Sequence, residues 1–174
     1  MRFASSCQIL VERADRAISR TLEGTKSEEK SKNYLNVLSE VRALIVTFRQ
    51  FLSAVHALEE IYRDHKAGRV CFGWVYAENQ NTLSLVKMET GLSILYTGNF
   101  IRITHKDRSL TITGSSKIGV KVNQYNDEID LKNEEEVLAK RSIILEAVGS
   151  VRSQLEKATE NIMLCVKQAK FKAV

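Results

Sequence analysis

VLAKRSIILEAVGSVRSQLEKATENIMLCVKQA, residues 137–169, carries a heptad pattern over almost its whole length. Apolar side chains recur at steps of three and four residues, which gives one apolar position per about 3.5 residues. This spacing keeps a seam of side chains facing a neighbouring helix as two helices supercoil. The stretch therefore predicts a long helix whose seam positions are Val137, Ile144, Val148, Val151, Leu155, Ala158, Ile162, Cys165 and Ala169.

Signals at both ends limit this helix to residues 133–171. Asn133 can cap its first turn, and the acidic run at 134–136 complements the positive end of the helix dipole. Lysines at 167, 170 and 172 complement the negative end.

Residues 1–67 predict two further amphipathic helices. The first places apolar side chains from Phe3 to Ile18 on one face and stops at Gly24. The second begins after a capping Ser27 and carries a seam from Tyr34 to Tyr62. Its apolar stripe is too wide for one neighbour, so we expect it to contact both other helices.

Between residues 69 and 125 the apolar period changes from 3.6 to 2, which is typical of strands. Turn-forming residues separate about six short strands: one around Trp74, then TLSLVKM, LSILY, FIRIT, SLTIT and IGVKV. The links are too short for crossover helices, so successive strands are expected to pair antiparallel as a meander.

Together these segments predict an α+β fold and a single domain over residues 1–174. The expected order is two helices, an inserted antiparallel β-meander of about six strands, and one helix. Because the two long helices flank a compact insert, we expect them to run antiparallel in a three-helix coiled coil or bundle. This gives a helical stalk with the β-meander as a head at one end.

The last helix also predicts self-association. Apolar residues beside its seam, from Leu138 to Val166, widen the stripe beyond what one partner helix covers. We therefore expect a homo-oligomer, most simply a dimer, with internal packing of a monomeric bundle as the alternative. Introducing Val151→Glu or Leu155→Lys should then cause dissociation or unfolding. The seam residues concerned are Ile144, Val148, Val151, Leu155, Ala158 and Ile162.

A cationic surface is predicted on the β-meander. If the isoleucines and valines of the later strands face inward, alternation sends their Arg, Lys and Thr side chains to the opposite face. Such a face suits phosphate groups or another acidic partner, whereas solvated charge that blocks strand aggregation is the alternative. The candidate binding residues on this face and at the adjoining turn are Arg102, His105, Lys106, Arg108, Lys117 and Lys121.

Catalytic and metal-binding patterns are not found. The histidines, His56, His65 and His105, lack the spacing needed to share a metal ion, and no Cys-x-x-Cys occurs. The glycines are spread through turns and form no phosphate-binding loop. We expect no metal, no cofactor and no enzymatic activity.

Three scattered cysteines, Cys7, Cys71 and Cys165, are expected to be reduced. The first residues lack the apolar core of a signal peptide, and no stretch approaches 18 uncharged apolar residues. The sequence therefore predicts an intracellular, cytoplasmic protein without a membrane partner.

Three functional hypotheses follow. The first is a non-enzymatic assembly or interaction protein, a self-associating helical stalk that presents its β head to a macromolecule such as another protein. The second is a nucleic-acid-binding protein that uses the cationic β face. The third is a small enzyme whose dispersed site has no recognisable motif. Steep salt dependence would distinguish nucleic-acid binding from an apolar interface.

Overall fold

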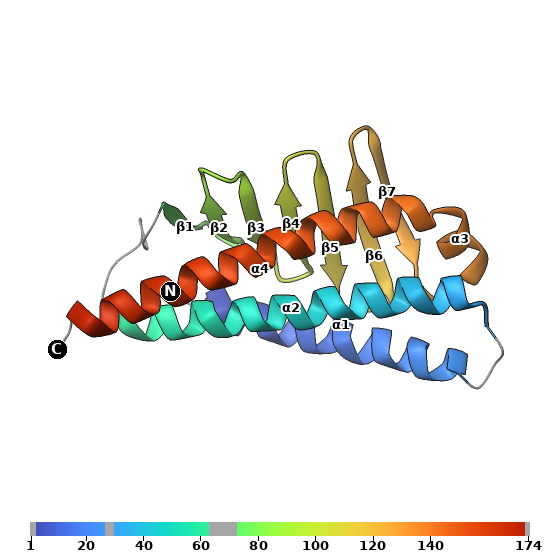
Figure 1. Ribbon diagram of the computed structural model, residues 1–174, viewed down its shortest axis with the longest axis horizontal. Coiled ribbons are helices and arrows are strands. Elements are labelled where there is room, and N and C mark those ends of the chain that lie inside the picture. The colour runs from blue at the N-terminus through green and yellow to red at the C-terminus, as the bar shows by residue number, and fades with distance from the viewer. Residues whose placement is uncertain (1–2, 27–29, 63–72, 173–174) are drawn as a thin grey trace.

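The computed structural model describes residues 3–26, 30–62 and 73–172, which form four helices and one seven-stranded antiparallel sheet (Figure 1). The mixture of helix and antiparallel sheet is as predicted, but the predicted number of three helices is wrong. The helices are α1 (Phe3–Lys26), α2 (Lys32–Tyr62), α3 (Glu134–Ala139) and α4 (Arg141–Lys172).

The sheet is a simple meander in which each strand pairs with its neighbours in sequence, in the order β1 to β7. All six pairings are antiparallel, as the short links between strands require. The strands are β1 (Trp74–Glu78), β2 (Leu83–Lys87), β3 (Leu92–Tyr96), β4 (Phe100–His105), β5 (Arg108–Thr113), β6 (Lys117–Val122) and β7 (Tyr125–Asp130).

β7 is the strand that the sequence pattern did not predict. Its sequence, YNDEID, contains three carboxylates, and Ile129 is its only buried residue. The strand is stabilised by pairing with β6, where Asp130 lies opposite Lys117. Cross-strand pairing of opposite charges, rather than alternation of apolar residues, explains why this segment is extended.

The predicted helix over residues 133–171 is broken into α3 and α4 at Lys140. Asn133 caps α3 as expected, and its side chain accepts a hydrogen bond from Glu136 N at 3.2 Å. Lys140 leaves the helical conformation, with φ −110° and ψ 16°. Its ammonium group pairs with Asp127 of β7 and lies 3.4 Å from Glu136, so the break is tied to the edge of the sheet.

α2 and α4 run parallel, so the predicted antiparallel arrangement is wrong (Figure 1). Near the start of α2, the Tyr34 hydroxyl donates to the carbonyl of Leu131, just before α3. Further along, Arg152 of α4 lies 3.5 Å from Glu40 of α2. Residue numbers therefore rise together along the two helices.

The width of the sheet explains this direction. Its strands lie roughly across the helix axes, so each successive strand moves the chain along the helices (Figure 1). Six steps of about 4.8 Å carry the chain about 29 Å, a large part of the roughly 46 Å length of α2. The sheet thus returns the chain to the level where α2 began, and α4 can start there.

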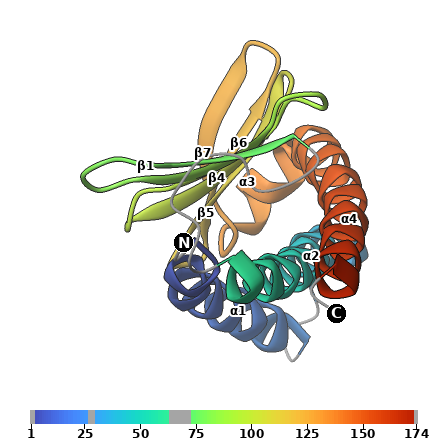
Figure 2. The ribbon, with the colours of Figure 1, turned by 90° about the vertical axis from the view of Figure 1, so that its left-hand side faces the viewer.

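The predicted head at one end of a stalk is also wrong, because the sheet lies along the side of the helices. The view along the helices shows α1, α2 and α4 as an arc on one face of the sheet (Figure 2). α4 contacts β4, β5 and β6, and α1 contacts β2, β4 and β5. No helix of the described residues covers the other face.

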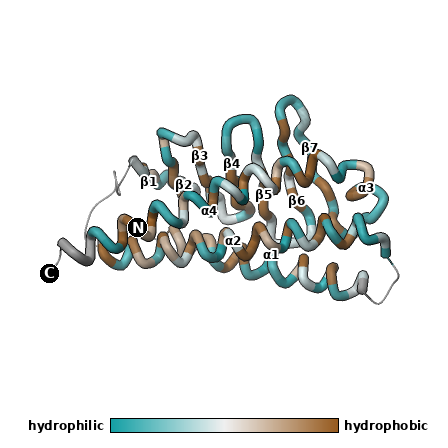
Figure 3. The backbone as a smooth tube through the Cα atoms, viewed as in Figure 1, coloured by the Kyte–Doolittle hydropathy of each residue, from teal (hydrophilic) through white to brown (hydrophobic). Residues whose placement is uncertain are grey.

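α2 lies between α1 and α4, and it contacts both, as its wide apolar stripe predicts. Its large side chains fill the space below the sheet. Phe48 and Phe51 are fully buried, and the Phe51 ring lies 5.9 Å from the ring of Trp74 on β1. One hydrophobic cluster therefore joins the helices and the sheet, while the tips of the β4–β5 and β6–β7 hairpins are hydrophilic (Figure 3).

The heptad seam of α4 is part of this cluster. Its members from Ile144 to Ile162 are between 0% and 6% exposed. They are buried within a single chain, so the breadth of the stripe is explained by contacts of α4 with both α2 and the sheet. A dimer through these side chains would have to replace those contacts.

One carboxylate is buried with the apolar residues. Glu59 of α2 is 6% exposed and accepts a hydrogen bond from Ala4 N, in the first turn of α1, at 2.9 Å. Burial raises the pKa of Glu59, and this hydrogen bond partly offsets the increase. The side chain serves as an acceptor for an otherwise unpaired N–H group at a helix start.

The structure also describes two of the three cysteines and the most apolar helix. Cys7 is a buried free thiol, but Cys165 is disulfide-bonded, so the expectation of a reduced Cys165 is wrong. Cys71 lies outside the described residues. α2 is long and apolar enough to cross a membrane by length and composition, and 56% of its most apolar window is buried inside the fold.

Two leucines of α4 provide a matched test of this packing. Leu155 is fully buried and Leu164 is 54% exposed. We expect Leu155→Ala to lower the free energy of unfolding by about 2–5 kcal/mol, and Leu164→Ala to change it by less than about 0.5 kcal/mol. Urea denaturation followed by circular dichroism measures both, and equal effects would contradict this arrangement of α4.

Candidate functional site

The uncovered face of the sheet carries three of the predicted cationic side chains. Alternate side chains of β4 and β6, such as Ile101 and Ile118, point to the helices. Arg102, Lys117 and Lys121 therefore lie on the opposite face and are exposed. We call the exposed face of β4–β6 the outer cationic face, defined by these three residues. Its placement agrees with the alternation of side chains along the strands.

Arg102 is held flat against the outer cationic face. Its Nε lies 3.3 Å from Thr111 Oγ1 on β5, and its guanidinium lies 4.9 Å from the centre of the Phe100 ring. Gly119 of β6 is opposite Thr111 on the other side. A Cβ at Gly119 would lie 2.9 Å from Thr111 Cβ, so a larger residue there would displace Thr111. The glycine therefore keeps this part of the face flat.

β7 adds acidic groups that the sequence prediction did not include. Glu128 lies opposite Gly119 and is 4.0 Å from the Lys117 ammonium, and Asp130 lies opposite Lys117. The positive charge of the sheet is consequently concentrated on β4 to β6 and falls towards β7. A negatively charged partner would be favoured away from the β7 edge.

His105 and Arg108 belong to the inner register and face α4 instead of solvent. Arg108 Nε lies 3.1 Å from Glu146, and His105 Nδ1 lies 3.4 Å from Ser150 Oγ. Lys106 is exposed in the turn between β4 and β5, where its φ is 55°. The six predicted residues thus divide into three on the outer cationic face, two that face α4 and one in the turn between β4 and β5.

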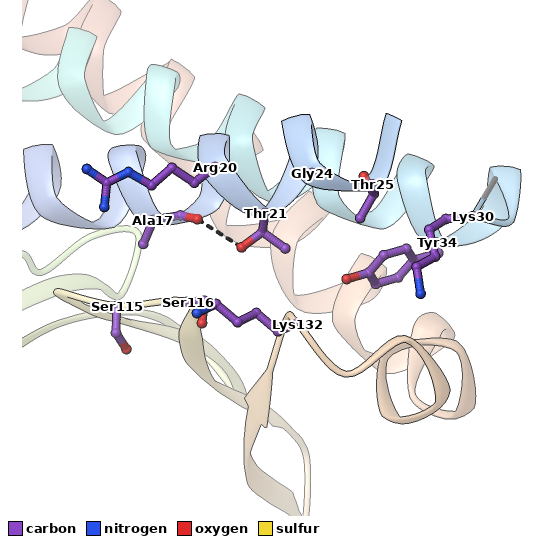
Figure 4. A pocket seen from close by; sticks show the side chains of 10 residues that line it. All are labelled: Ala17, Arg20, Thr21, Gly24, Thr25, Lys30, Tyr34, Ser115, Ser116 and Lys132. Carbon is purple, nitrogen blue, oxygen red and sulfur yellow. Dashed lines mark hydrogen bonds between the residues drawn. The ribbon is translucent and has the colours of Figure 1, made fainter. Parts of the chain in front are cut away.

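A separate pocket of about 500 Å³ was not predicted from the sequence (Figure 4). It lies between the C-terminal half of α1, the start of α2, the β5–β6 loop and the link from β7 to α3. Three cationic side chains, Arg20, Lys30 and Lys132, line it, and none of its lining residues within the described part of the chain is acidic. We call it the α1–β5–β6 pocket.

Hydrogen bonds already orient several groups around this pocket. Thr21 Oγ1 donates to Ala17 O at 2.9 Å, and Thr25 Oγ1 donates to Leu22 O at 2.7 Å. Lys30 lies 3.3 Å from Glu134. By contrast, Arg20 and Lys132 form no side-chain ion pair with any residue that the structure describes.

Local sequence signals could not identify this pocket. Arg20 reads as a solvent-facing residue of an amphipathic helix, and Lys132 lies in a link beside the unpredicted strand β7. Their proximity depends on α1 packing beside β5, which no local pattern specifies. The one signal was the excess of basic over acidic residues in the chain.

Within the described residues, no three His, Cys, Asp or Glu side chains gather in a group that could hold a metal ion. No protein-family model matches this chain, and neither a curated protein nor a solved structure matches it. The outer cationic face and the α1–β5–β6 pocket are therefore the two candidate sites of this chain.

His105 gives a prediction about pH. Burial lowers the pKa of His105, and the positive charges of Lys106, Arg108 and Lys157 lower it further. Between the folded pKa and the ordinary value of 6.5, the unfolded chain therefore binds more protons than the folded chain. The free energy of unfolding should fall as the pH is lowered through this window.

His105→Gln removes the titrating group and should reduce the fall in the free energy of unfolding at low pH. We expect the variant to become more stable relative to the original chain as the pH falls from about 8 to about 5. Urea denaturation of both proteins at each pH measures the difference. A difference that stays constant over this range would contradict the prediction.

Proposed function

We propose that this chain is a non-enzymatic interaction protein whose outer cationic face docks an anionic macromolecule. The observation that supports this proposal is the contrast between the two faces of one sheet. The inner face is buried against the helices, whereas the outer face is uncovered and presents Arg102, Lys117 and Lys121. In this proposal the helices serve as the scaffold that keeps the sheet rigid.

Nucleic acid is the partner that best fits this chemistry. Lys and Arg side chains supply charge to phosphates, and Thr111 and Thr113 supply neutral hydrogen-bonding groups beside them. Phe100 is the only aromatic ring on the outer register of the described strands, and Arg102 lies over it. Base stacking therefore contributes little, and the proposed binding depends weakly on base sequence.

Replacing Arg102, Lys117 and Lys121 together with alanine tests this proposal. We expect weaker binding to unrelated DNA and RNA sequences by a similar factor, because the lost contacts are to phosphate. The slope of log affinity against log salt concentration should become shallower by about 2 to 3. Fluorescence anisotropy at several salt concentrations measures both quantities.

The matched control is a triple alanine variant of Arg16, Arg42 and Lys167. These exposed cations lie on three different helices, and their loss changes the net charge by the same amount. The control variant should bind DNA and RNA as tightly as the original chain does. Equal weakening in both variants would indicate an effect of net charge only, and undetectable binding by the original chain at low salt would reject a nucleic-acid partner.

We propose self-association into a dimer as a second candidate. Since the seam of α4 is buried, the proposed contact uses the adjacent Met163 and Leu164, which are 42% and 54% exposed. Neighbouring exposed apolar side chains on a helix are typical of contact surfaces. An enzymatic function is not proposed, because no observed feature favours one.

Light scattering tests this candidate at high micromolar concentration. We expect a dimer for the original chain and a monomer for the Met163→Ser, Leu164→Ser double variant, with the circular dichroism spectrum unchanged. Met88→Ser is the control, because Met88 is likewise an apolar side chain on the surface, 71% exposed, that lies outside α4 in the turn after β2. A monomeric original chain would reject the dimer.

A further inference from the structure

We propose that the α1–β5–β6 pocket binds a phosphorylated polyol, such as a sugar phosphate. This inference goes beyond the docking of a macromolecule on the outer cationic face. The pocket and that face use different cations: Arg20 and Lys132 in the pocket, and Arg102, Lys117 and Lys121 on the sheet.

The cations of the pocket select for a phosphate group. An arginine can donate to two phosphate oxygens at once, and a lysine adds a compact positive charge. Arg20 belongs to α1 and Lys132 to the β7–α3 link, so the two cations that line the pocket come from different elements of the fold (Figure 4). Neither charge is neutralised by a side chain that the structure describes.

The hydroxyl groups of the pocket select for a different part of the ligand. Thr21 and Thr25 already donate their protons to backbone carbonyls of α1. Ser116 Oγ donates to a side chain instead, the Oδ1 of the Asp130 carboxylate, at 3.2 Å. Each oxygen therefore has lone pairs left with which to accept, and a ligand that donates O–H groups complements them.

The size of the pocket indicates a ligand larger than a free phosphate ion. Its volume of about 500 Å³ lies within the range typical of small-molecule sites. A phosphate ion would occupy a small part of this space and leave the lone pairs of these hydroxyl oxygens without a donor from the ligand. A polyol that carries a phosphate satisfies both the cations and the acceptors.

Isothermal titration calorimetry tests the proposal with four soluble probes: glucose 6-phosphate, AMP, glucose and inorganic phosphate. We expect at least one of the two phosphate esters to bind with a Kd below about 1 mM, and both glucose and inorganic phosphate to bind more weakly. Vesicles that contain phosphatidylinositol 4-phosphate form a further arm. Binding to these vesicles without binding to the soluble esters would identify a lipid headgroup as the source of the same chemistry.

Variants assign the binding to the pocket. Arg20→Gln and Lys132→Gln should each weaken it about tenfold or more, since each removes a charge-assisted hydrogen bond. Thr21→Val should weaken binding of the preferred ester or headgroup but not of inorganic phosphate, because the Thr21 proton is already donated to Ala17 O and the hydroxyl can offer the ligand only an acceptor. Arg16→Gln and Lys121→Gln are controls with equal loss of charge outside the pocket. Both should bind the preferred ester or headgroup as tightly as the original chain does.

Two results would overturn the proposal: no binding of either ester or of the vesicles, or binding that Arg20→Gln and Lys132→Gln leave unchanged. The outer-face triple variant separates this test from the one above. It should bind the preferred probe normally even though its nucleic-acid binding is weakened. If the triple variant and the pocket variants lose the probe equally, the pocket is not the site.

Discussion

The burial of α2 is the constraint on which the rest of this structure depends. Its apolar stripe is wider than one neighbouring helix can cover, and leaving it in water would cost about 25 cal/mol for each Å² of exposed apolar surface. α1 and α4 flank the helix on two sides, and the sheet closes the third through contacts such as Phe51 with Trp74. This requirement places three segments that are distant in sequence around one helix. The meander then decides the direction of α4, because its width carries the chain back along α2 before the last helix begins.

A sheet covered on one face separates its side chains by chemistry. Inward positions are filled by Ile, Leu and Val, and outward positions remain free for polar and charged groups. A charge is expensive to bury without a partner, which explains why Arg102, Lys117 and Lys121 all face outward. Arg108 is an informative exception, because its register is inward but it reaches Glu146 at the edge of α4. The same alternation that builds the core therefore creates the proposed docking surface.

The α1–β5–β6 pocket has a different origin. It forms where the end of α1, the start of α2 and two links of the sheet meet without filling the space between them. Each segment contributes between one and three polar side chains, none of which forms a recognisable motif in its own stretch of sequence. Their combination gives a concave site that is lined by both cations and hydroxyl groups. Concavity distinguishes this site from the flat outer face and favours a small ligand over a long polymer.

Local patterns in the sequence determined the elements and their buried sides. Heptad spacing located the long helices, period-two alternation located six strands, and short turns specified the antiparallel meander, because each of these depends on residues close together in the chain. Alternation also gave the outward direction of Arg102, Lys117 and Lys121. Sequence patterns did not predict β7, because its stability comes from pairing with β6 rather than from its own apolar residues. They did not predict the break at Lys140, because the heptad pattern continues across it. Only the tertiary structure decided the parallel course of α2 and α4, the burial of the α4 seam within one chain, and the presence of Arg20 and Lys132 in the lining of one pocket. These features depend on how far the sheet carries the chain and on which faces meet, and such distances between remote segments are not encoded in any single stretch of sequence.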